Sequence, residues 1–357
     1  MKERNLIVEN NYQIFFITFF YACIKNLYFI FIFLLLYNKC QKDRDAMDNN
    51  LKNKISIGLS LTISIEEYKI ILDRYREYIN SIYFSLPLGD IYHSRSDISR
   101  RFKDENIVNH FYEIINFFKE NNIYLDCVFN KNSLNEKALI DGLKYLKSYT
   151  DVDQITCFNE HVDIVNDFFP NVEKIYSYNN NLNPSLIDNI SELFDTVVVG
   201  KYFMRDYNLL KQVYDKGFEL KLLVNNGCSF NCLGCGSGIE KCEETFNRNR
   251  KYSDINTMYA KQSFYPFELN ELLDVIDFPI KYIKISNRTS GFEYLYKCLE
   301  SYIYNIDPIE YIKDGNKYYR LWCRLAHFDR RIDELDNSAI LKQKKLLLEK
   351  SRNNICI

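Results

Sequence analysis

The sequence predicts a (β/α)8 barrel, the TIM-barrel class, with a short helical extension at its C-terminus. Two observations predict it: eight short β-branched or aromatic runs, and stretches of helical periodicity that alternate with them. Such alternation is typical of a parallel sheet covered by helices, and eight units are enough to close a barrel. A doubly wound open sheet is the alternative. No strand is followed by a G-x-G-x-x-G loop, which disfavours the nucleotide-binding folds of that kind.

The strands are predicted where apolar, β-branched or aromatic residues cluster. These runs are 54–62, 81–87, 123–130, 153–159, 172–178, 195–200, 218–225 and 280–286. Helices are predicted where apolar residues recur with the period of an amphipathic helix. These stretches are 64–79, 105–122, 134–150, 160–169, 183–194, 205–217 and 267–277. Ser64 with Glu67 forms a capping-box pattern, and Gly217 falls between a helix and a strand, as a helix C-cap would.

The N-terminus is unlike the rest of the chain. Residues 14–37 are apolar enough, and long enough, to span a bilayer as a helix. Three interpretations stay open: a native start at Met47 with no such segment, a membrane anchor, or a cleaved signal. We therefore divide the chain into an N-terminal extension (1–46), a barrel domain (47–305) and a helical C-terminal extension (306–357). A chain that begins at Met47 is expected to fold and stay soluble.

Composition narrows the function classes. The net charge is −2 over 357 residues, so no overall basic field attracts nucleic acid. Eleven cysteines in a long chain of regular elements do not resemble a secreted disulfide scaffold. A reducing, cytoplasmic compartment is predicted, with membrane attachment only if residues 14–37 are native. We interpret Cys127, Cys157 and Cys298 as small buried apolar groups.

Four cysteines lie together after the seventh predicted strand, with the spacing Cys228-x3-Cys232-x2-Cys235-x6-Cys242. Barrel enzymes carry their chemistry on the loops at the C-terminal ends of the strands, so this is a suitable place for a site. Four thiolates can hold either a [4Fe–4S] cluster or zinc. Only Cys232 and Cys235 form a clean CxxC pair, which weakens the zinc alternative.

A radical S-adenosylmethionine enzyme is a further alternative. Cys228, Cys232 and Cys235 satisfy C-x3-C-x2-C, in which three thiolates leave one iron open for that cofactor. In that superfamily, however, the motif follows the first strand of the barrel and an aromatic residue precedes the third cysteine. Here the motif follows the seventh strand, and the preceding residue is Gly234.

The stretch "KLLVNNGCSFNC" resembles the "LLVNEGC-x3-C" segment of the peptidase U32-like family, and residues 263–302 resemble that family's following helix and "KI-x-GR" strand end. The resemblance is patchy over residues 54–305. Here "NNG" replaces "NEG", and Asn287 stands where glycine is usual. The relatives include tRNA and rRNA hydroxylation proteins and an oxygen-independent ubiquinone-hydroxylation pair.

The resemblance implies a barrel with a cysteine-ligated [4Fe–4S] cluster and a redox, hydroxylation or modification reaction on RNA or a small molecule. Cys228 and Cys232 match its Cys-x3-Cys motif, Cys242 plausibly matches a later cysteine, and Cys235 is added from spacing alone. It also implies basic site residues at Arg205, Lys284 and Arg288, which would suit an anionic substrate. No Ser/His/Asp or Cys/His arrangement supports peptidase activity. A protein partner stays open.

Other polar candidates are weaker. Asn179, Asn180 and Asn181 end the fifth predicted strand and are candidates for substrate binding, although asparagine is common in turns. Asn225 and Asn226, beside the cysteine cluster, are candidates for the same role. His93 lies in a polar loop after the second predicted strand and is a candidate acid–base group.

Overall fold

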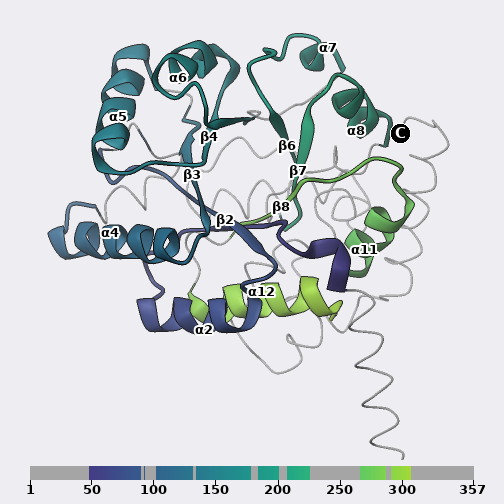
Figure 1. Ribbon diagram of the computed structural model, residues 1–357, viewed down its shortest axis with the longest axis horizontal. Coiled ribbons are helices and arrows are strands. Elements are labelled where there is room, and N and C mark those ends of the chain that lie inside the picture. The colour runs from purple at the N-terminus through teal and green to yellow at the C-terminus, as the bar shows by residue number, and fades with distance from the viewer. Residues whose placement is uncertain are drawn as a thin grey trace, which may run out of the picture. The chain divides into compact units, whose positions relative to one another are not determined.

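Eight parallel strands close into a barrel in the computed structural model, in the order in which they occur in the chain (Figure 1). The structure describes residues 48–89, 92, 102–131, 134–177, 184–200, 207–225, 266–286 and 291–306. The chain divides into two compact units, Met1–Asn49 and Asn50–Ile357, and the barrel belongs to the second. Within the described ranges, no helix has the length and apolar character needed to cross a membrane. Residues 14–37 lie outside those ranges.

Seven of the eight predicted runs contain a strand, and the run 81–87 overlaps one that begins two residues earlier, at Ile79. The strands are β1 (Ile55–Gly58), β2 (Ile79–Phe84), β3 (Tyr124–Phe129), β4 (Gln154–Cys157), β5 (Glu173–Tyr176), β6 (Thr196–Gly200), β7 (Glu219–Leu223) and β8 (Tyr282–Ile285). β8 pairs in parallel with both β7 and β1, with Ile283 opposite Ile55 on β1. This pairing closes the sheet, so the (β/α)8 prediction is confirmed and the open doubly wound alternative is wrong.

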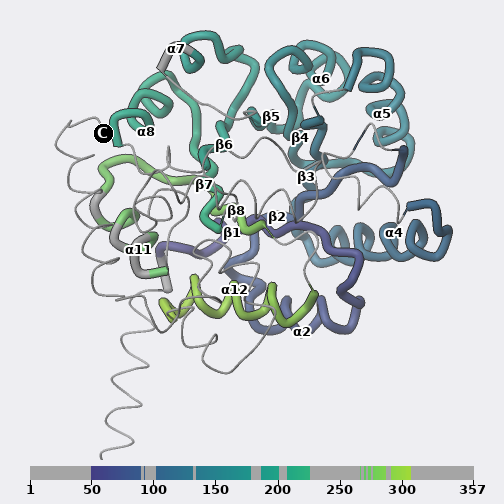
Figure 2. The backbone as a smooth tube through the Cα atoms, turned by 180° about the vertical axis from the view of Figure 1, so that it is seen from behind, coloured from purple at the N-terminus to yellow at the C-terminus, as the bar shows by residue number. Residues whose placement is uncertain are grey.

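Helices surround the barrel and bury its outward-facing side chains. They are α2 (Ile65–Tyr75), α4 (Glu105–Glu120), α5 (Glu136–Tyr149), α6 (Val162–Phe168), α7 (Pro184–Ile187), α8 (Tyr207–Asp215), α11 (Pro266–Val275) and α12 (Phe292–Tyr304), with short 3-10 turns η1 (Asp48–Leu51) and η3 (Asn159–His161). Among the described residues, the last helix, α12, lies beside the first, α2, in both views (Figures 1 and 2). Tyr75 and Tyr296 make an edge contact there at 5.3 Å between ring centroids.

The predicted caps are present. The Ser64 hydroxyl accepts a hydrogen bond from the backbone N–H of Glu67 (3.2 Å), and the Glu67 carboxylate accepts one from the backbone N–H of Ser64 (2.8 Å). Gly217 has a φ of 91°, a left-handed conformation that glycine adopts without strain. It ends the turn between α8 and β7.

Two helices end more than two residues before the predicted position. The first helix ends at Tyr75 rather than at residue 79, because Ile79 pairs with Ile55 as the first residue of β2. The helix predicted over 183–194 is a single turn at Pro184–Ile187. The Asn159 side chain explains this stop, because it accepts from the Ser191 N–H and donates to the Asn189 carbonyl. These backbone groups are thereby bonded without a continued helix.

Candidate functional site inside the barrel

Only two of the predicted site residues, Lys284 and Asn225, are among those that the structure describes. The others lie outside the described residues: Cys228, Cys232, Cys235, Cys242, Arg205, Arg288, His93, Asn179, Asn180, Asn181 and Asn226. Lys284 is on β8, and Asn225 follows β7 by two residues. Both therefore lie toward the C-terminal ends of neighbouring strands, where barrel enzymes carry their chemistry.

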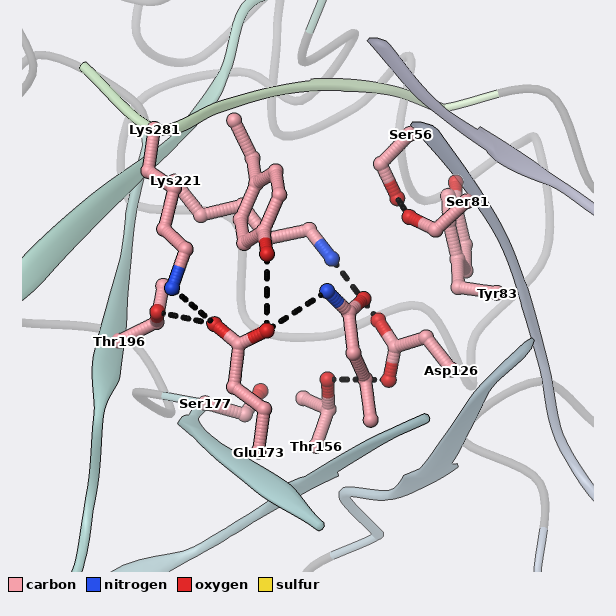
Figure 3. Close-up of polar contacts among 12 residues, drawn as sticks. Ser56, Ser81, Tyr83, Asp126, Thr156, Glu173, Ser177, Thr196, Lys221 and Lys281 are labelled. Carbon is pink, nitrogen blue, oxygen red and sulfur yellow. Dashed lines mark hydrogen bonds and ion pairs between the residues drawn. The ribbon is translucent and has the colours of Figure 1, made fainter. Parts of the chain in front are cut away.

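The interior of the barrel is unusually polar. Side chains alternate between the two faces of a strand, so every second residue points inward. The outward residues, such as Ile57 and Ile283, join the apolar core under the helices. The inward positions include Ser56, Ser81, Asp126, Gln154, Thr156, Glu173, Thr196, Lys221, Tyr282 and Lys284. Figure 3 shows that their contacts form two groups, one around Asp126 and one around Glu173, with a serine pair to the side.

The first group, the central cluster, is built on a buried ion pair between Asp126 of β3 and Lys221 of β7. The Lys221 ammonium donates to Asp126 Oδ2 at 2.8 Å, and both side chains have no exposed surface. Thr156 of β4 donates its hydroxyl to Asp126 Oδ1 at 2.7 Å. Both carboxylate oxygens therefore have a donor, which a buried charge requires.

Lys284 adds a second ammonium group to the central cluster. Burial alone would raise the pKa of Asp126, but the positive charges of Lys221 and Lys284, with the hydrogen bonds from Lys221 and Thr156, hold it below its ordinary value of 3.8. The Lys284 Nζ also lies 4.2 Å from the centre of the Tyr83 ring, a cation–π distance. The Tyr83 hydroxyl in turn donates to the Ile285 carbonyl at 2.9 Å. The side chain of Tyr83 thus links β2 to β8 beside Lys284.

The second group, the floor cluster, closes the N-terminal end of the barrel around Glu173. Its carboxylate accepts four hydrogen bonds, at 2.6–3.0 Å. The donors are Gln154, Thr196, Lys281 and Tyr282. Glu173, Gln154, Thr196 and Tyr282 are each the first residue of a strand. Contacts at this end of a (β/α)8 barrel serve stability rather than catalysis.

Tyr282 separates the two clusters. Its hydroxyl belongs to the floor cluster, while Lys221 of the central cluster lies 5.4 Å from the centre of its ring. Burial, and the negative charge of Glu173, raise the pKa of Tyr282, which keeps the phenol protonated as a donor. The floor is therefore a closed structural plug below the central cluster.

Asn225 fixes the point from which the cysteine segment begins. Its side-chain oxygen accepts from the Ser286 N–H (2.6 Å), and its amide nitrogen donates to the Ser286 carbonyl (3.1 Å) and to the Tyr294 hydroxyl (3.2 Å). Both amide hydrogens are therefore used within the protein, and the residue is 2% exposed. This contact, the Asn225 clamp, extends the pairing of β7 with β8 by a side chain. Cys228 follows three residues later.

The described cysteines are buried in the core. Cys127, Cys157 and Cys298 are buried, as predicted, and none is in a disulfide. Burial raises the pKa of all three thiols, which keeps them protonated. Within the described part of the chain, no three His, Cys, Asp or Glu side chains are grouped as a metal site would require.

Comparison with known proteins adds little to this geometry. No protein-family model matches the chain, and no curated protein matches it. Among solved structures, tryptophan synthase from M. tuberculosis aligns at 8% identity over 79% of this chain and 94% of its own, with a TM-score of 0.38. N-acetylneuraminate lyase from Fusobacterium nucleatum aligns at 11% identity over 85% and 99%, with a TM-score of 0.38. Likeness at this level carries no argument about function, and the barrel assignment rests on the strand pairing itself.

Sequence analysis missed Asp126, Lys221 and Glu173. The available signal was a lone charged residue inside an otherwise apolar run, as in "YLDCVF" and "ELKLL". Strands of a parallel barrel are buried on both faces, so a charge at the centre of such a run needs a buried partner. Closure of the barrel decides which residue is the partner, because it makes β3 and β7 face each other across the interior.

Proposed function

We propose that this protein is an iron–sulfur barrel enzyme of the U32-like type. In this proposal Cys228, Cys232, Cys235 and Cys242 hold a [4Fe–4S] cluster above the C-terminal end of the barrel. The reaction is a redox modification, such as an oxygen-independent hydroxylation, of a small molecule or RNA. The cluster would supply electron transfer, and the chain would bind and orient the substrate beside it.

The observation that carries the proposal is the Asn225 clamp. It ties the end of β7 to the end of β8 through a buried amide, so the cysteine segment starts from a fixed point. That point is at the catalytic end of a (β/α)8 barrel, next to the strand that carries Lys284. The donor chemistry also fits, since four cysteines can supply all four protein ligands of such a cluster.

The direct test is anaerobic purification of the full chain with an absorption spectrum and iron and sulfide assays. We expect a brown protein with about four irons and four sulfides per chain. Cys228→Ala and Cys232→Ala should abolish the colour. Cys157→Ala is the matched control, because that thiol is buried and protonated, and it should keep the full iron content.

Three outcomes would contradict the proposal. Stoichiometric zinc without iron would indicate a zinc-stabilised, non-catalytic binding module. Reductive cleavage of added S-adenosylmethionine would indicate a radical enzyme that uses Cys228, Cys232 and Cys235. Iron retained in the Cys228→Ala and Cys232→Ala variants would remove these cysteines from the ligand set.

Three further variants separate binding of the cluster from use of the substrate. Lys284→Ala and Arg288→Ala are expected to keep the cluster but to lose activity, because neither side chain is a cluster ligand in the proposal. Asn225→Ala removes the clamp and is expected to lower the iron content together with the stability, by about 1–2 kcal/mol. Full iron content in Asn225→Ala would show that the clamp does not position the cysteine segment.

A further inference from the structure

The Asn225 clamp is completed from outside the sheet, by Tyr294 of α12. The Asn225 amide nitrogen donates one hydrogen to the Ser286 carbonyl at 3.1 Å and the other to the Tyr294 hydroxyl at 3.2 Å. Asn225 is 2% exposed and Tyr294 is 3% exposed, so bulk water does not take the place of this acceptor. Without the Tyr294 hydroxyl, the second amide hydrogen would be buried and unbonded, which is costly.

Tyr294 also contacts the other side of the clamp. Its hydroxyl lies within 3.5 Å of the Ser286 carbonyl oxygen, as a long hydrogen bond, and that oxygen also accepts from Asn225. Asn225 follows β7 by two residues and Ser286 follows β8 by one. These neighbouring strands end at the face of the barrel that carries chemistry in such enzymes. Tyr294 therefore ties α12 to both strand ends where the cysteine segment begins.

Cys298 supports the Tyr294 hydroxyl from the same helix. It lies four residues after Tyr294 on α12, so the two side chains project from one face of that helix. The thiol is fully buried, and its hydrogen-bond partners are the side chains of Tyr294 and Asn225. Burial raises the pKa of the Cys298 thiol, and these two contacts offset part of the rise. Cys298 is thus more than the small apolar group that the sequence predicted, because its sulfur takes part in the clamp.

We propose that Tyr294, supported by Cys298, is a positioning residue that holds the Asn225 amide in place and lets α12 fix the start of the cysteine segment. The inference deepens the proposed function and rests on it only for the role of the cysteines, since every clamp contact lies among the described residues. Cys228 is three residues beyond Asn225, at most about 10 Å of extended chain. A displacement of the clamp is therefore passed on to the first proposed ligand.

The test is amide hydrogen exchange of the full chain, resolved by residue. The Ser286 amide donates to Asn225 in the clamp at 2.6 Å, whereas the Ile283 amide of the same strand donates to a carbonyl outside the clamp at 2.8 Å and serves as the reference. In Tyr294→Phe, Ser286 should exchange about five-fold faster relative to Ile283, because one hydrogen bond is lost locally. Tyr68→Phe is the matched control. Its hydroxyl is equally buried and makes two backbone hydrogen bonds away from the clamp, so the ratio should not change.

Cys298 provides a rescue by a conservative variant. Cys298→Ala removes the sulfur and should raise the same exchange ratio about three-fold, because the Tyr294 hydroxyl loses one hydrogen-bond partner. Cys298→Ser keeps a hydrogen-bonding atom at that position and should leave the ratio as in wild type. Equal increases in the two variants would show that packing, not a polar contact, is what Cys298 supplies, and would remove it from the clamp.

An unchanged ratio in Tyr294→Phe would overturn the inference. An equal rise in Tyr68→Phe would overturn it too, because it would show a general loss of stability. If Tyr294→Phe is unfolded by circular dichroism, the Cys298 variants decide alone, and an unchanged ratio in Cys298→Ala rejects the inference.

Iron assays on the same samples keep the two proposals apart. We expect Tyr294→Phe to lose iron to a chelator faster than wild type, and Tyr68→Phe to lose it at the wild-type rate. Faster exchange with unchanged loss of iron would overturn the link between the clamp and the cysteine segment. Wild-type protein without iron, but with the expected change of exchange in Tyr294→Phe, would reject the proposed function and leave the positioning of Asn225 by Tyr294 intact.

Discussion

The two polar clusters inside the barrel differ in how their charges are matched. In the floor cluster, one carboxylate, that of Glu173, takes four donors, of which only Lys281 is charged. In the central cluster, two ammonium groups share the carboxylate of Asp126. The floor is thus built on one carboxylate that collects several donors, whereas the described centre is built on a fully buried ion pair with a second lysine nearby. The difference separates a cluster that is partly open to water through Lys281 from one whose ion pair has no exposed surface.

Removing Lys221 should have the largest effect on stability. Lys221→Met leaves Asp126 buried with no directly bonded ammonium group, and we expect a loss of about 3–5 kcal/mol in the free energy of unfolding. Urea denaturation followed by circular dichroism measures this loss. The double variant Asp126→Leu/Lys221→Met should recover much of it, because it removes the isolated charge as well. A loss under about 1 kcal/mol in the single variant would show that the pair is not buried as described.

The second-largest loss of stability is expected in the floor cluster. Glu173→Gln keeps the shape of the side chain but replaces one acceptor oxygen by an amide NH2 group, so the donors on that side lose their acceptor, and we expect a loss of about 1–3 kcal/mol. Glu77→Gln is the matched control, since Glu77 pairs with Lys52 at the exposed surface and should change stability by less than about 1 kcal/mol. Equal losses in the two variants would remove the distinction between the floor cluster and a surface ion pair.

The pH dependence of stability tests the charge of Asp126 in the central cluster. The folded-state pKa of Asp126 lies below its ordinary value of 3.8. Its charge therefore contributes stability that is fully present above pH 3.8 and is lost as the pH falls through the lower, folded-state value. We expect the difference in free energy of unfolding between wild type and Asp126→Asn to shrink on acidification below pH 3.8, by at most about 1.4 kcal/mol per pH unit. Urea denaturation at a series of pH values measures it, and parallel curves for the two proteins would contradict the assignment.

The smallest effect is expected for Lys281. Its side chain is 35% exposed, so its ion pair with Glu173 is partly screened by water. Lys281→Met should change the free energy of unfolding by no more than about 1 kcal/mol. The same denaturation assay gives the value. A loss as large as that of Lys221→Met would show that the floor depends on charge as strongly as the centre does.

The sequence by itself determined the strands, most of the helices and the fold class. Each strand run is short, apolar and flanked by a helix pattern, and each of these signals is local. The capping box at Ser64 and the left-handed turn at Gly217 were predictable for the same reason, because a few neighbouring residues decide them. The single turn of α7 was not, since a hydrogen-bonding side chain from a distant element, Asn159, ends it.

Only the tertiary structure decided which polar residues meet. Asp126 and Lys221 are far apart in the chain, and closure of the barrel brings them to 2.8 Å. Alternation along each strand places them on the inward face, but it does not tell which residue of another strand lies opposite. That depends on the register of all the strands between them. The same register sets Ser56 beside Lys284 and buries Lys284, which the sequence predicted only as a basic site residue.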